Sequence, residues 1–146
     1  MKAITALLTL ATAFTFALSP GNTAFAADDD TPLTKEMNGV NKDLRKLKKQ
    51  VADASKKDEN IGLVDDIKKH LVTGRDMEPA TTKDQPADKK AAFIAKYKEQ
   101  IDSTIKDFDA LSAAIKADKA DEAKTLLEKL QKDKEQGHKD FRPDDK

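Results

Sequence analysis

The chain of 146 residues contains no cysteine, and this absence excludes several classes of site. Without thiols it cannot form disulfides, a thiolate zinc site, an iron–sulfur cluster or the thioether bonds that attach haem covalently. Basic and acidic residues balance at 27 each, so the chain also lacks the basic surface that a nucleic acid requires of its partner. Its stability must therefore come from an apolar core.

Aromatic residues and strand-like patterns are scarce as well. Beyond residue 26 the aromatic residues are Phe93, Tyr97, Phe108 and Phe141. No stretch alternates apolar and polar residues, and alanine, lysine, glutamate, leucine and aspartate dominate, which indicates helix throughout. There is no glycine-rich phosphate loop, no evident carboxylate pair and no serine nucleophile with a local base, so we do not expect an enzyme.

Long apolar runs are limited to one, at the beginning of the chain. It extends from Ala3 to Leu18, follows Lys2, and is broken by Ser19-Pro20-Gly21 before the small-residue pattern Ala24-Phe25-Ala26. A spanning helix needs roughly 18–20 apolar residues, which this run does not reach. The pattern predicts a secretory signal peptide over residues 1–26, removed after Ala26, and one domain over residues 27–146 with no membrane segment.

Helical periodicity and helix-ending residues divide that domain into four predicted helices. Their bounds are Pro32–Ser55, Glu59–Glu78, Asp88–Lys116 and Asp121–Phe141. Thr31 followed by Pro32 is a typical helix start, and the prolines at positions 79 and 86 indicate a loop over residues 79–87. Four helices of similar length with short connections predict an all-α fold, an antiparallel up-down-up-down four-helix bundle.

The apolar stripes of these helices predict the core, and one stripe is interrupted. The first helix has a heptad-like stripe of Leu33, Met37, Val40, Leu44, Leu47 and Val51. The second presents Val64, Ile67, Leu71, Gly74 and Met77, and the third Phe93, Tyr97, Ile101, Phe108, Leu111 and Ile115. The fourth begins with Ala123, Leu127 and Leu130 but continues with Lys134, Gly137 and His138. A bundle that loses its apolar filling at one end usually holds something else there.

Met37 and His138 stand out because an up-down-up-down bundle brings the start of its first helix and the end of its last helix to the same end. A methionine and a histidine together form an axial ligand pair of electron-transfer haem iron. Each residue also has a plainer explanation. A methionine on a core stripe is ordinarily a gap filler, and a histidine near a helix C-terminus interacts favourably with the helix dipole.

His70 is the other histidine, and we expect it to be a surface residue. It lies on the flank of the Ile67 and Leu71 stripe, among lysines and aspartates, and at a height one to two turns from the end of the second helix, away from Met37. Met77 could supply a second thioether near the same end, although packing explains it equally well.

The chain resembles the soluble periplasmic cytochrome b562 family over essentially all of its length after residue 26. In the first helix the resembling residues are Leu33-x-x-x-Met37-x-x-Val40-Asn41-x-x-Leu44. In the last helix they are Glu122-Ala123, Leu130 and His138-x-x-Phe141-Arg142. The chain departs from the family at Gly137, where an aromatic residue is usual, and in a longer segment between Leu47 and Val64.

The resemblance implies a periplasmic electron-transfer protein with one non-covalent haem b. Met37 and His138 match the ligands of its iron, while Tyr97 and Ile101, with Val40, match positions that line the haem pocket. Lys134 and Arg142 match basic residues near the haem, where they would pair with its propionates. The implied partners are redox proteins, and we expect a monomer.

An alternative of another class stays open at this stage. A haem-free periplasmic helical bundle, acting as a binding or stress-response module, would use Met37 as core filler and expose His138. Binding of copper or another metal by methionine and histidine is a variant of this alternative.

Overall fold

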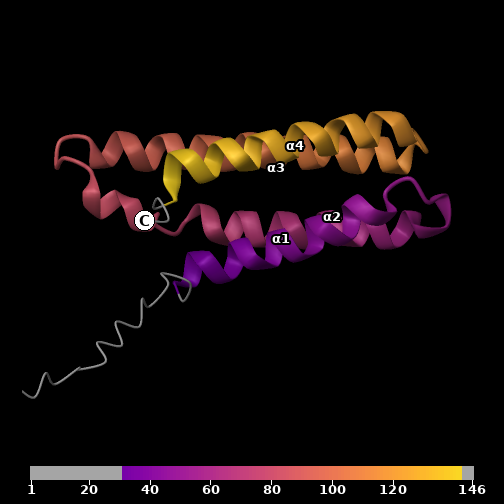
Figure 1. The fold of residues 1–146 in the computed structure, drawn as a ribbon, viewed down its shortest axis with the longest axis horizontal. Helices are drawn as coiled ribbons and strands as arrows, with labels where there is room; N and C mark the ends of the chain where they lie inside the picture. Colours follow the sequence, from indigo (N-terminus) through magenta and orange to yellow (C-terminus); the bar gives the residue numbers. More distant parts are fainter. Residues whose placement is uncertain (1–30, 143–146) are drawn as a thin grey trace, which may run out of the picture.

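The computed structural model describes residues 31–142, which form four α-helices and two short 3-10 helices with no strand among them (Figure 1). The α-helices are α1 (Pro32–Gln50), α2 (Lys57–Arg75), α3 (Lys90–Lys116) and α4 (Ala120–Phe141), and the 3-10 helices are η1 (Ala54–Lys56) and η2 (Ala80–Asp84). The all-α prediction is confirmed. The signal peptide expected over residues 1–26 lies outside the described residues.

Helix α1 begins as the sequence predicts and ends five residues early. The Thr31 hydroxyl accepts a hydrogen bond from the Thr34 amide at 3.1 Å, with Pro32 in the first turn. The predicted end at Ser55 is wrong, because Asp53 starts η1 by accepting from the Ser55 amide at 2.9 Å. Buried Asn60 then donates to the Gln50 carbonyl at 3.2 Å, which satisfies a free group at the end of α1.

The predicted ends of α3 and α4, Lys116 and Phe141, are confirmed, and the other bounds of α2 to α4 differ from the prediction by one to three residues. Helix α2 spans Lys57–Arg75 instead of Glu59–Glu78, because the amides of Asp76 and Met77 both bond the Gly74 carbonyl in a tightened last turn. Helices α3 and α4 begin at Lys90 and Ala120 instead of Asp88 and Asp121. The predicted loop over residues 79–87 contains η2.

Consecutive helices pack closely against one another, α1 on α2, α2 on α3 and α3 on α4, whereas α1 and α4 are not a closely packed pair. Figure 1 shows α3 and α4 lying side by side above α1 and α2. At one end of the molecule Lys57 pairs with Asp118 of the α3–α4 turn at 2.8 Å. At the other end the Thr81 hydroxyl donates to the Phe141 carbonyl at 2.8 Å, so that η2 holds the end of α4.

The core is densest in the half of the bundle that contains the Lys57–Asp118 pair, and we call it the filled half. Its residues are buried Leu47, Val64, Leu111, Ala114, Ile115, Ala123 and Leu127. The other half, which we call the open half, contains Leu33, Met37, Lys134 and Gly137, all only partly buried. Among residues 31–142, no helix combines the length and apolar character that crossing a bilayer requires.

Candidate ligand cavity

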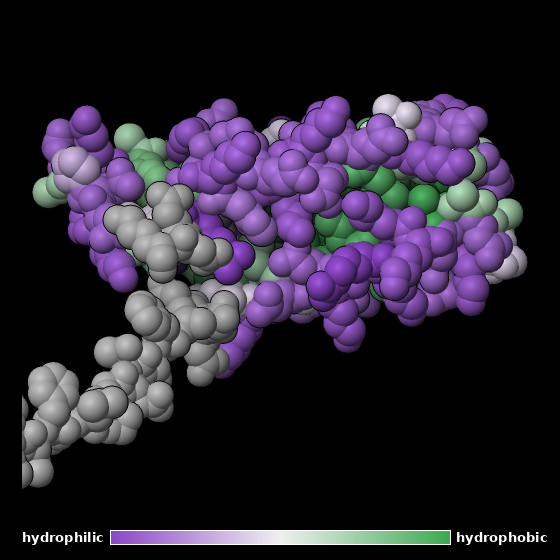
Figure 2. All heavy atoms as spheres, viewed as in Figure 1, coloured by the Kyte–Doolittle hydropathy of each residue, from purple (hydrophilic) through white to green (hydrophobic). Residues whose placement is uncertain are grey.

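The open half contains a cavity of about 310 Å³ that is built by all four helices. From α1 it takes residues between Leu33 and Leu44, and from α4 residues between Leu130 and Phe141, with Leu71, Tyr97, Ile101 and Phe108 from α2 and α3. In Figure 2 the apolar side chains seen between rows of polar ones lie toward the end with the α3–α4 turn, in the filled half, and not over this cavity. The cavity volume is within the range of roughly 300–1,000 Å³ that is usual for small-molecule sites.

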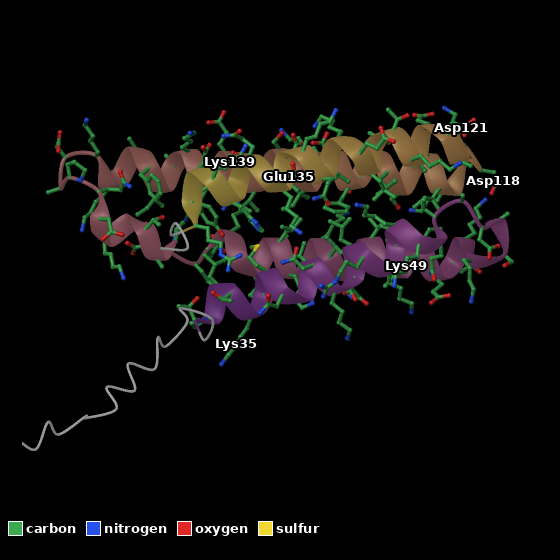
Figure 3. All side chains as sticks on the ribbon, viewed as in Figure 1. Lys35, Lys49, Asp118, Asp121, Glu135 and Lys139 are labelled. Carbon is green, nitrogen blue, oxygen red and sulfur yellow. The ribbon has the colours of Figure 1, made fainter. Side chains whose placement is uncertain are left out.

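All the residues that the sequence suggested as haem contacts line this cavity. They are Met37 and Val40 from α1, Tyr97 and Ile101 from α3, and Lys134, His138 and Arg142 from α4 and its cap. Lys35 near the start of α1 and Lys139 near the end of α4 mark the corresponding end of the molecule in Figure 3. Met37 and His138 therefore lie on the wall of one cavity although they are about a hundred residues apart in the chain.

His138 is in the last turn of α4 and is more exposed than its place on the inward stripe predicts. Its side chain nevertheless contributes to the cavity wall, and this partial burial is the main reason that its pKa is lowered below the ordinary value. The neighbouring cations Lys134 and Arg142 lower the pKa further. Near neutral pH these effects favour the uncharged imidazole, which is the form that binds a metal.

Positive charge on the cavity wall has no carboxylate partner in the described part of the chain. Neither Lys134 nor Arg142 forms an ion pair among residues 31–142, whereas Lys124 and Lys129, two of the other four lysines of α4, do. Partial burial lowers the pKa of Lys134, and the charges of Arg45 and Lys48 on α1 lower it further. Lys134, which is partly desolvated, and Arg142, which is exposed, are therefore unpaired cations that suit the carboxylate of an anionic ligand.

A cluster of aromatic rings closes the end of the cavity. The Phe141 ring packs edge-on against Phe93 and Tyr97, with centroid distances of 5.2 and 5.3 Å. The Tyr97 hydroxyl is buried and donates to the Gly74 carbonyl at 2.7 Å, and burial raises its pKa to about 12. Tyr97 is therefore a neutral, fixed wall residue at any physiological pH.

His70 lies five residues before the end of α2, as predicted, but the expectation that it lies away from Met37 is wrong. Its Nδ1 atom lies 2.7 Å from Oε2 of Glu36, the residue before Met37, and its ring covers Gly39. A Cβ atom at Gly39 would lie 2.6 Å from His70 Nε2, so glycine makes room for this ring. His70 is thus level with Met37, but it is not among the residues that line the cavity. His70 lies on a face of α2 that does not line the cavity.

Some polar lining residues were not anticipated from the sequence. Gln100 and Asp133 both reach the cavity, and the Gln100 amide donates to the Asp133 carbonyl at 3.4 Å. Thr104, one turn beyond Gln100, donates to the Gln100 carbonyl at 2.9 Å. Gln100 and Thr104 are spaced four residues apart beside the Tyr97 and Ile101 stripe, and this spacing was the available signal for a polar strip in the wall.

The groups on the cavity wall are of the kinds that a haem would use. Within residues 31–142, no three histidine, aspartate or glutamate side chains gather closely enough to hold a metal. A thioether and an imidazole on separate helices, apolar walls and unpaired cations are together the groups that a haem and its propionates would use. Met37 and His138 would hold the iron, and Lys134 and Arg142 the carboxylates.

Comparisons of the chain with models of protein families, with curated proteins and with solved structures found no match in any of the three.

Proposed function

We propose that this protein transfers single electrons in the periplasm by means of one non-covalent haem b. The haem would lie in the open half of an antiparallel up-down-up-down bundle, the chain direction that the pairs Lys57–Asp118 and Thr81–Phe141 support. The observation that carries the proposal is the presence of Met37 and His138 on the wall of the same cavity. The resemblance to the cytochrome b562 family points in the same direction.

The haem would supply an iron that cycles between two oxidation states. In the proposal the Met37 sulfur and a His138 ring nitrogen hold this iron from helices α1 and α4. The lowered pKa of His138 favours the neutral ring as a ligand, because a protonated imidazole has no free lone pair. A thioether ligand stabilises the reduced iron relative to a second imidazole, and so it raises the reduction potential.

The other wall residues would select and orient the ligand. Val40 and Ile101 are buried apolar residues that keep water from the cavity, and Tyr97 fixes the wall through its bond to Gly74. Lys134 and Arg142 would pair with the two propionates, because each is a cation without a carboxylate partner among residues 31–142. These roles place the apolar part of the ligand inward and its anionic edge toward α4.

Because both axial ligands come from the chain, the iron would have no open position for a substrate. The protein would therefore carry electrons between redox partner proteins and would not be an enzyme. We expect it to act as a monomer, since its own cavity supplies every proposed ligand group.

The proposal is tested by adding haem to the purified protein and recording the visible spectrum after reduction. We expect the sharp, split bands of low-spin haem b, and complete extraction of the haem by acid–acetone because no cysteine can bond it. A protein that takes up no haem would contradict the proposal and favour the haem-free binding module.

The Met37→Ala variant tests the thioether separately. It should still bind haem through His138, but with a high-spin spectrum and a lower reduction potential, because the sulfur that favours reduced iron is gone. A redox titration of both proteins measures the difference. An unchanged potential would show that Met37 only fills space.

A further inference from the structure

Gly74 is a buried glycine that makes room for the end of the Met37 side chain. It lies in the last turn of α2, and a Cβ atom built on it would be 2.7 Å from Met37 Cε and 3.2 Å from Leu33 Cδ1. No glycine in the described chain has a positive φ angle, so the backbone does not require glycine here. The reason for glycine at position 74 is therefore space for Met37 and Leu33.

The backbone at Gly74 is held in place by three hydrogen bonds to its carbonyl oxygen. The Tyr97 hydroxyl donates to it at 2.7 Å, and the amides of Asp76 and Met77 donate to it from the end of α2. Moving this backbone away from α1 would disturb the buried bond from α3. A side chain added at position 74 would therefore displace the flexible end of Met37 and leave the backbone where it is.

We infer that Gly74 is a positioning residue for the Met37 thioether, an inference that rests on the proposed haem function. A thioether binds a metal through a lone pair on sulfur, so the terminal methyl group must have room on another side. The space beside Gly74 is occupied by that methyl, while Met37 also lines the cavity. A methyl group driven out of this space would move to a different rotamer, and the lone pairs of the sulfur would turn with it.

The same helix offers a matched control. Gly62 is also in α2, but it is exposed and has nothing within 4 Å of a built Cβ. Gly62→Ala and Gly74→Ala make the same residue change in the same helix and differ in the contact with Met37. Any difference between the two variants therefore reports on the space beside position 74.

The first measurement uses the haem-free protein labelled with ¹³C at the methionine methyl groups. The signal that disappears in Met37→Ala identifies the Met37 methyl. We expect Gly74→Ala to shift this signal strongly and Gly62→Ala to leave it unchanged, because only the first substitution places an atom within 3 Å of Met37 Cε. A Met37 signal that does not move in Gly74→Ala overturns the inference, whether or not the protein binds haem.

The second measurement adds haem and records the reduced spectrum and the reduction potential. Gly74→Ala should lose the low-spin bands and lower the potential as Met37→Ala does, whereas Gly62→Ala should match the wild type. Wild-type spectra in Gly74→Ala overturn the positioning role. If the wild type binds no haem, the proposed function fails, and the role of Gly74 in ligation fails with it, while the methyl signal still decides whether Gly74 places the thioether.

A third variant covers the case in which Gly74→Ala does not fold. In the Met37→Ala background the nearest clash is absent, so Gly74→Ala should fold with the helix content of Met37→Ala alone, as measured by circular dichroism. Failure to fold in this background would show that Gly74 serves a contact other than Met37, and it would overturn the inference.

Discussion

The two halves of the bundle use the same helices and differ in how completely those helices fill the space between them. In the filled half Leu47, Val64 and Leu111 are fully buried. In the open half Leu33 and Met37 continue the stripe of α1 but are only partly buried, and His138 is exposed. An unbroken stripe on one helix therefore does not make a closed core unless the facing helix supplies apolar residues.

The difference originates in α4. Its first half contributes Ala123, Leu127 and Leu130, which are buried against the other helices. Its second half contributes Lys134, Gly137 and His138, a cation, a residue without a side chain and a titratable ring. Since polar groups are costly to bury without partners, this half of α4 leaves a cavity toward α1. The polar residues of α4 therefore specify the open half, just as its apolar residues specify the filled half.

The largest expected effect comes from making the same substitution in each half of α1. Leu47→Ala removes a fully buried side chain of the filled half and should lower the free energy of unfolding by about 2–5 kcal/mol. Leu33→Ala removes a partly buried side chain beside the cavity and should cost roughly 1 kcal/mol. Urea unfolding of the haem-free variants measures both. Equal losses would mean that the two halves are equally packed.

A smaller effect concerns pH and arises only in the open half. The pKa of His138 in the folded chain lies below its ordinary value of 6.5, because of partial burial first and then the charges of Lys134 and Arg142. Between the folded and unfolded pKa values the unfolded chain binds more protons, so this contribution to stability is complete above about pH 6.5 and is lost as the pH falls through the folded pKa. The midpoint of urea unfolding should therefore decrease on acidification of the haem-free protein.

His138→Gln should remove that part of the pH dependence, and His70→Gln should leave it in place, because His70 does not face the cavity. The check is the difference between unfolding midpoints at about pH 7.5 and pH 5.5 for the three proteins. The same acid loss in His138→Gln as in the wild type would contradict the burial of the His138 ring.

The smallest expected effect is a gain in stability when a glycine of α4 in the open half is replaced by alanine. A Cβ atom at Gly137 would lie 3.6 Å from Gln100 Nε2, an ordinary van der Waals contact. Gly137→Ala should therefore raise the stability of the haem-free protein by about 0.5–1 kcal/mol, through helix propensity alone. Thermal unfolding measures this change. A loss of stability would show that the wall at Gly137 is tighter than the cavity implies.

The sequence predicted the four helices and their inward stripes because both depend on periodicity, whereas the full set of candidate lining residues came from the resemblance. The stripes from Leu33 to Leu47 and from Tyr97 to Ile115 follow from the 3.6-residue helical repeat, which neighbouring residues already reveal. The end of α1 was predicted wrongly because Asp53 begins η1 there, and because Asn60, a buried residue of the next helix, bonds the Gln50 carbonyl. The periodicity of a single helix does not predict contacts of this kind between two helices.

The same reason explains the error at His70 and the role missed at Gly74. The height of His70 relative to Met37 is set by how α1 and α2 approach each other, and Gly39 lets the His70 ring lie across α1. Gly74 was expected in the core, but its contact with Met37 depends on that same approach. Two glycines thus lie where α1 and α2 approach each other closely, and their partners are identified only when both helices are seen together.

The most direct test of the central claim is the haem affinity and spectrum of two single variants, His138→Ala and His70→Ala. Both remove a histidine, but only His138 lines the cavity with Met37. We expect His138→Ala to bind haem more weakly and to lose the low-spin bands, and His70→Ala to keep the affinity and spectrum of the wild type. Loss of the low-spin bands in His70→Ala, with His138→Ala unaffected, would contradict the assignment of the open half as the haem site.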